Sequence, residues 1–112
     1  MKKGVLFVLA AALALPAMAG TETFKNVSVI DVACSQKAAA NPDAHTRECA
    51  LECEKTGYGV ITADKQYLKF DSAGNAQIAA ELKKSTAKDH LRVNVTGDVE
   101  GDTLHVKTVK LL

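Results

Sequence analysis

The feature that most constrains the fold is a period-two pattern in residues 91–111. Apolar side chains recur at every second position of residues 91–99, where Gly97 occupies one of the apolar places, and polar side chains fill the positions between. The sequence EGD then predicts a turn, and a second strand-like run, TLHVKTVKL, follows it. Because successive side chains of a strand point to opposite faces, this pattern predicts a β-hairpin with one buried face. A glycine inside a strand is typical of a tight bend, such as a barrel corner.

Upstream of the hairpin the sequence predicts three more strands and a helix. Residues 23–33 form a long strand whose alternation changes phase between Val29 and Ile30, which predicts a bulge or a sharp bend. Two short strands flank a turn at residues 63–66, and a helix lies within residues 71–85.

A further helix is predicted at about residues 42–56. Asn41, Pro42 and Asp43 are a strong helix start, because they supply a cap, a first-turn proline and a charge that complements the helix dipole. Gly57 is placed to end this helix.

This order of elements predicts the fold. Five short strands with a helix between the third and the fourth are typical of a small OB-type barrel. We therefore expect a mainly β chain with two short helices, in which a five-stranded OB-like barrel carries a helix inserted between strands 1 and 2. A simple α+β sandwich with the same strand order is the competing fold.

Two stretches resemble a known family. YLKFDSAGNAQIAAEL, residues 67–82, contains Asp71 and Gly74 after a predicted hairpin, and LRVNVTGDVEGDTLHVKTVKLL, residues 91–112, contains a Val-x-Val-x-Gly-x-Val strand. Together they resemble the small exported bacterial OB-fold (BOF-like) proteins, over about half of the mature chain. The resemblance implies a periplasmic, non-enzymatic domain. The predicted Cys/His helix at 42–56 departs from the usual pattern of that family and indicates a branch with an inserted helix.

The N-terminus has the three parts of a signal peptide. Lys2 and Lys3 are the basic part, residues 5–15 are an apolar run, and AMA at residues 17–19 matches the small-x-small cleavage pattern. The apolar run is shorter than the roughly 20 residues that a transmembrane helix needs. We expect residues 1–19 to be removed, which leaves one domain at residues 20–112, periplasmic or secreted and without a membrane anchor. An uncleaved anchor is the alternative.

The charge balance limits the classes of partner. Without Lys2 and Lys3, the mature chain has 12 basic and 13 acidic residues, a net charge of about −1. Nucleic-acid-binding domains usually present a strongly basic face, so nucleic acid is not an expected partner. A small ligand, a metal ion or a periplasmic protein remains as a partner.

The candidate site is built on three cysteines and one histidine. His45, Cys49 and Cys53 are four residues apart, so a regular helix would place them in one stripe. Three interpretations stay open. The stripe is a small packing face, since free cysteine is often buried; or Cys34 forms a disulfide with Cys49 or Cys53; or Cys34, His45, Cys49 and Cys53 bind zinc or copper.

These interpretations predict different roles for the histidine. If the stripe is structural, His45 lies exposed on the first helical turn and its replacement by alanine is nearly neutral. If the four residues bind a metal, His45 is a ligand.

The sequence contains no serine–histidine–acid arrangement, paired acid site or phosphate loop, so we expect no enzyme. Tyr67 and Lys69 resemble part of an OB-type stacking face, although a core role for the tyrosine fits better. His90 and His105 are expected on the surface. The sequence predicts an exported binding or interaction module without catalysis; the alternative is a thiol- and imidazole-based metal-binding or redox protein.

Overall fold

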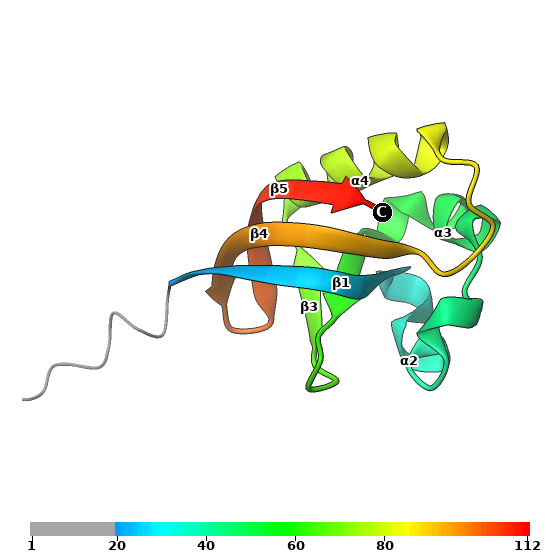
Figure 1. Ribbon diagram of the computed structural model, residues 1–112. Coiled ribbons are helices and arrows are strands. Elements are labelled where there is room, and N and C mark those ends of the chain that lie inside the picture. The colour runs from blue at the N-terminus through cyan, green and yellow to red at the C-terminus, as the bar shows by residue number, and fades with distance from the viewer. Residues whose placement is uncertain (1–19) are drawn as a thin grey trace, which may run out of the picture.

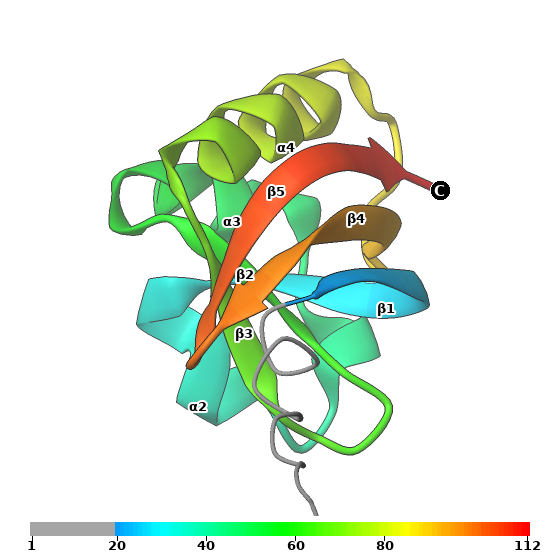
Figure 2. The same cartoon turned by 90° about the vertical axis from the view of Figure 1, so that its left-hand side faces the viewer.

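The computed structural model describes residues 20–112, so the predicted signal peptide lies outside the described residues. Five strands close into a barrel in the order β1-β2-β3-β5-β4 (Figures 1 and 2). Neighbouring strands are antiparallel except β3 and β5, which are parallel. The predicted mainly β, five-stranded OB-like barrel is confirmed. The strands are β1 (Thr21–Asp31), β2 (Tyr58–Ile61), β3 (Tyr67–Phe70), β4 (Arg92–Glu100) and β5 (Thr103–Leu111).

The barrel interior is filled by the alternate apolar side chains of these strands. In β4, Val93 and Val95 are buried while Asn94 and Thr96 are half-buried, as the period-two pattern predicts. The β4–β5 pairing becomes irregular between Thr96 and Gly97. A Cβ atom at Gly97 would lie 2.4 Å from the carbonyl oxygen of His105, so only glycine allows the two strands to approach this closely.

One end of the barrel is covered by α4 (Ser72–Lys84), which buries Ile78 and Leu82. Asp71 caps this helix by accepting a hydrogen bond from the Gly74 N–H, and the same oxygen accepts one from the Val106 N–H of β5. A Cβ atom at Gly74 would lie 2.4 Å from a Val106 methyl group, so the glycine lets α4 pack against β5. The Asp-x-x-Gly pattern therefore joins helix, cap and strand.

None of the helices in residues 20–112 is both long and apolar enough to cross a membrane.

The predicted irregularity of β1 lies earlier than the sequence indicates. The β1–β4 register shifts between Phe24 and Val27, where Asn26 has a left-handed backbone with φ of 54°. The change of phase at Val29 and Ile30 has another cause. Val29 faces the barrel core, whereas Ile30 is fully buried outside that core, on a strand that contacts the inserted segment. Both faces of β1 are covered at this end.

The inserted segment, residues 32–57, differs from the single helix predicted at 42–56. It consists of short helical pieces: η3 (Val32–Cys34), α2 (Ser35–Ala38), η4 (Pro42–Ala44), α3 (Arg47–Glu52) and η5 (Glu54–Thr56). The prediction of one continuous helix is wrong, because His45 and Thr46 are extended. The Thr46 side chain accepts a hydrogen bond from the Cys49 N–H and starts a new helix there. Gly57, with φ of 87°, ends the segment as predicted.

Candidate functional site

The site is organised around Asp31, the last residue of β1. Its side chain is fully buried. Its Oδ2 atom accepts a hydrogen bond of 3.1 Å from the Cys34 N–H and thereby caps η3, while its Oδ1 atom lies 2.6 Å from His45 Nε2. A buried carboxylate is costly unless hydrogen bonds, an ion pair or a metal ion compensate it. Asp31 is not among the site residues predicted above, although an aspartate directly after the strand-like stretch NVSVI was a signal for it.

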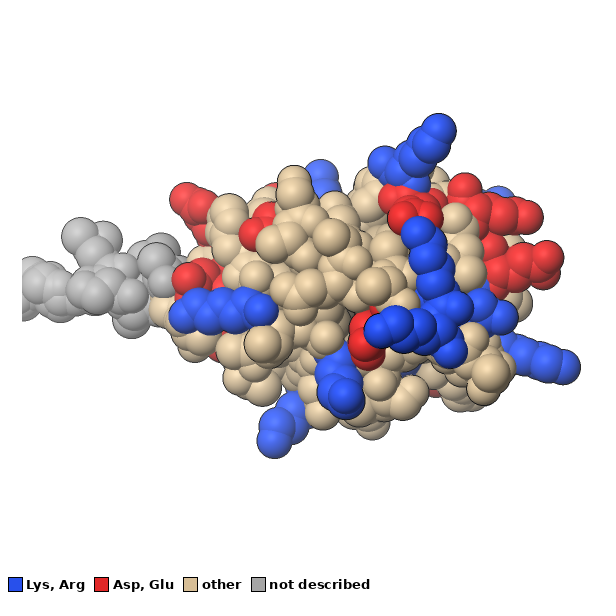
Figure 3. All heavy atoms as spheres, turned by 90° about the horizontal axis from the view of Figure 1, so that it is seen from above, with Lys and Arg blue, Asp and Glu red and all other residues tan. Residues whose placement is uncertain are grey.

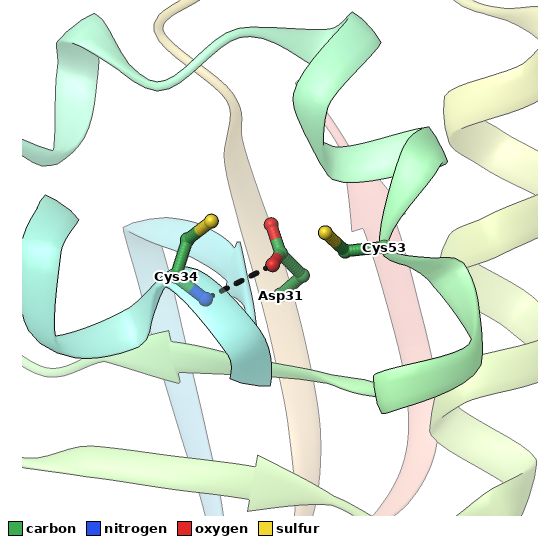
Figure 4. Close-up of side chains that lie close together, drawn as sticks. All are labelled: Asp31, Cys34 and Cys53. Carbon is green, nitrogen blue, oxygen red and sulfur yellow. Dashed lines mark hydrogen bonds between the residues drawn. The ribbon is translucent and has the colours of Figure 1, made fainter.

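Two of the three cysteines approach this carboxylate. Cys34 lies between η3 and α2, and Cys53 ends α3, so the two thiols come from opposite ends of the inserted segment. Figure 4 shows the two sulfur atoms on either side of the Asp31 carboxylate, each directed towards it. The two sulfur atoms and one carboxylate oxygen all lie within 4.8 Å of one another.

His45 reaches the same carboxylate from η4. Its side chain is only 9 % exposed, so the expectation of a solvent-exposed imidazole is wrong. The reason is the extended backbone at His45, which ends the 3-10 turn and directs the ring towards β1 instead of along a helix surface. The imidazole N–H donates to Oδ1 and holds the carboxylate in one orientation.

Cys49 is the predicted site residue that stands apart. It is exposed, and it does not belong to the group formed by Asp31, Cys34 and Cys53. It lines a pocket of about 360 Å³ together with Cys34 and His45. Of the four predicted residues, the structure therefore brings Cys34, His45 and Cys53 to Asp31 and leaves Cys49 at the rim.

All three cysteines are free thiols in the structure. The sequence left open whether Cys34 has Cys49 or Cys53 as its neighbour, and the structure places Cys53 at the group that contains Cys34. Burial raises the pKa of both the Cys34 and the Cys53 thiol, and the negative charge of Asp31 raises it further.

The two thiols and the Asp31 carboxylate lie close together, which disfavours thiolates but favours the binding of a cation. A metal ion placed between the groups would supply the positive charge that two thiolates and a carboxylate need. Sulfur and carboxylate oxygen are both zinc ligands, and the sulfur pair also suits copper(I). The residue types and their separation thus fit a small, soft or borderline cation.

The remaining sequence candidates have structural or surface roles. Tyr67 donates a hydrogen bond of 2.8 Å to the Ile30 carbonyl oxygen, and its ring lies so close to Gly59 that a Cβ atom there would be 2.6 Å from it. Burial raises the pKa of the Tyr67 hydroxyl. His90 and His105 are exposed beside carboxylates, as predicted.

Charges of both signs are interspersed on the face that carries α4 (Figure 3).

Comparison with known proteins finds no matching family model, no similar curated protein and no similar solved structure. The geometry around Asp31 is therefore the main indication of function.

Proposed function

We propose that this protein is an exported binding module of OB-fold type whose ligand is a d¹⁰ transition-metal ion, zinc or copper(I). The ligands are Asp31, Cys34 and Cys53. The observation that carries the proposal is that three ligand atoms of these residues, one of them on a fully buried carboxylate, lie within 4.8 Å of one another. A surface cluster would not have this burial, and an ordinary packing face would not contain the carboxylate.

His45 acts on the ion through Asp31. Its Nε2 atom is 2.6 Å from Oδ1, which fixes the carboxylate that faces the two sulfur atoms. Hydrogen bonds to metal ligands of this kind typically change affinity by about 10- to 100-fold when they are removed. His45 is therefore a positioning residue, and its loss weakens binding without changing the number of ions bound.

Export is part of the proposal because the signal-like residues 1–19 precede the domain. The barrel supplies a rigid strand end at Asp31, and the inserted segment supplies both thiols and the imidazole.

The test is a titration of the reduced protein with Zn²⁺ and with Cu⁺ under anaerobic conditions, against a chromophoric chelator. We expect one ion per chain and a rise in melting temperature, because a ligand of the native state stabilises by mass action. Cys53→Ser should weaken binding by at least about 100-fold, because it replaces a soft thiolate by a poor ligand.

The matched control is Cys49→Ser, which changes the same residue type four positions earlier, outside the group. It should leave the affinity unchanged, while His45→Ala should weaken binding and keep the one-to-one stoichiometry. Absence of stoichiometric binding would reject the proposal, and so would an equal loss in the Cys49 and Cys53 variants.

A further inference from the structure

The two thiols of the site face each other as well as the carboxylate. We propose that Cys34 and Cys53 are a reversible dithiol–disulfide pair that controls the site: the dithiol binds the metal ion, and the disulfide excludes it. The inference rests on the proposed metal-binding function and adds its regulation by the redox state of the surroundings.

The distance to be closed is small. The two sulfur atoms are within 4.8 Å of each other, whereas a disulfide requires about 2.05 Å. Cys53 is the C-terminal cap of a six-residue helix, and Cys34 lies at the junction of two helical turns. Neither is held in the middle of a long element, so side-chain rotation with a small movement of the segment brings the sulfurs together.

The pair is also accessible. Cys34 and Cys53 are both partly exposed, and Cys34 lines the pocket that opens beside His45 and Cys49. A small disulfide can therefore reach at least one of the two thiols. Asp31, in contrast, is fully buried and out of reach of such a molecule.

Oxidation by a small-molecule disulfide, such as oxidised glutathione, balances as follows. One protein thiolate attacks a glutathione sulfur, which forms a mixed disulfide and releases one glutathione thiolate. The second protein thiolate attacks the protein sulfur of that mixed disulfide, which forms the Cys34–Cys53 bond and releases the second glutathione. The protein loses two electrons and two protons, and the oxidant gains both.

The two states of the pair are mutually exclusive. A metal ion binds thiolates, and a disulfide has none to offer, so oxidation leaves Asp31 as the remaining ligand of the three. In the other direction, a bound ion occupies both thiolates and withholds them from attack on the oxidant. Metal should therefore slow oxidation, and oxidation should abolish metal binding.

The experiment follows the oxidation of the protein over time, until equilibrium, in glutathione buffers of graded oxidation, with and without saturating Zn²⁺. Intact mass and peptide mapping identify the disulfide, and chelator competition measures metal affinity in each state. We expect a Cys34–Cys53 disulfide that dithiothreitol reverses, oxidation at least about tenfold slower with Zn²⁺, and affinity at least about 100-fold lower after oxidation. Cys49→Ser should behave as the unmodified protein, and Cys34→Ser should form no such bond.

Failure of the inference is distinguishable from failure of the proposed function. If the reduced protein binds metal but the oxidised protein binds it equally, or if Zn²⁺ leaves the oxidation rate unchanged, the switch is rejected and the metal site stands. If oxidation maps to Cys49 or joins two chains, the switch is also rejected. If the reduced protein binds no metal while the Cys34–Cys53 bond forms, the metal function and its control fail together.

Discussion

The barrel and the inserted segment at residues 32–57 are stabilised by different kinds of contact. The barrel has a continuous apolar interior to which all five strands contribute. In the inserted segment, Ala50 is the one buried residue of the helical pieces. Few apolar side chains join the segment to the core, namely Ala50 and the partly buried Leu51. Polar contacts add to them, among them the Arg47 side chain on the Ala87 carbonyl oxygen at 2.9 Å and the Tyr58 hydroxyl on the Ala50 carbonyl oxygen at 2.8 Å.

This difference places the chemistry at a boundary. Asp31 belongs to the barrel, while Cys34, His45 and Cys53 belong to the inserted segment. Burial of apolar side chains fixes the barrel strand that carries Asp31. The segment that carries Cys34, His45 and Cys53 has fewer buried contacts, so it can move locally at a lower cost in free energy. A site built across such a boundary can change its ligands without unfolding the domain, which the proposed exchange between metal binding and thiol oxidation would require.

The largest effect is expected in the barrel. Val95 is 1 % exposed in β4, so Val95→Asp places an unpaired charge in the core and should cost about 4 kcal/mol or more of unfolding free energy. Thr96, the next residue, is half-buried beside the Thr23 hydroxyl at 3.0 Å, and Thr96→Asp should cost about 1 kcal/mol or less. Urea unfolding of both variants measures the difference. Equal losses would contradict the apolar origin of barrel stability.

The next effect is expected at the boundary. His45→Ala removes the partner of Asp31 Oδ1 and leaves the Cys34 N–H as the other hydrogen bond to this buried carboxylate. The cost should be about 2–3 kcal/mol, and not the nearly neutral change that an exposed histidine predicts. Amide hydrogen exchange should be faster in residues 32–57 than in β4 and β5, and the replacement should accelerate it in the segment.

His90→Ala is the matched control, because the His90 side chain is 68 % exposed beside its neighbour Asp89. Its effect should be within about 0.5 kcal/mol. If the two histidine variants were equally stable, or if exchange in residues 32–57 were as slow as in β4 and β5, the segment would not be a separately held unit.

The same division explains what the sequence predicts well. Strand β4 follows from period-two alternation, because its side chains face alternately into and out of the barrel. Strand β5 follows from the turn and the apolar residues after it, although its burial pattern changes phase between Val106 and Val109. Helix α4 follows from Ile78 and Leu82, which are four residues apart and therefore lie on one helical face. These are short-range or periodic signals, and they determine most of the barrel.

The site follows less directly from the sequence because its contacts are long-range and polar. The Asn-Pro-Asp start is genuine, but it produces one 3-10 turn, and the Thr46 side chain then begins a separate helix. That interruption turns His45 towards Asp31, fourteen positions earlier in the chain. Helical spacing could indicate the cysteines as candidates, but only the fold identifies Cys53 and the buried carboxylate as neighbours of Cys34.

The smallest effect is expected at another polar contact between segment and barrel. Arg92 of β4 donates two hydrogen bonds to Asp43 of η4, at 3.0 and 2.9 Å, and the two side chains are 35 % and 29 % exposed. The hydrogen bond from Arg92 lowers the pKa of Asp43 below its ordinary value. Asp43→Asn should cost about 1 kcal/mol at neutral pH, near the upper end for pairs this exposed to solvent.

The pH dependence of that cost gives the sharper result. Because the pKa of Asp43 is lower in the folded than in the unfolded protein, its contribution is complete above the unfolded value of about 3.9 and disappears as the pH falls through the folded value. The difference in unfolding free energy between the protein and Asp43→Asn should therefore shrink below about pH 4, and added salt should also reduce it at neutral pH. Asp102→Asn, at an exposed position in the β4–β5 turn, serves as the control and should show neither trend. A cost for Asp43→Asn that is independent of both pH and salt would mean that packing rather than charge ties η4 to the barrel, and the contrast between an apolar barrel and a polar insertion would be lost at this contact.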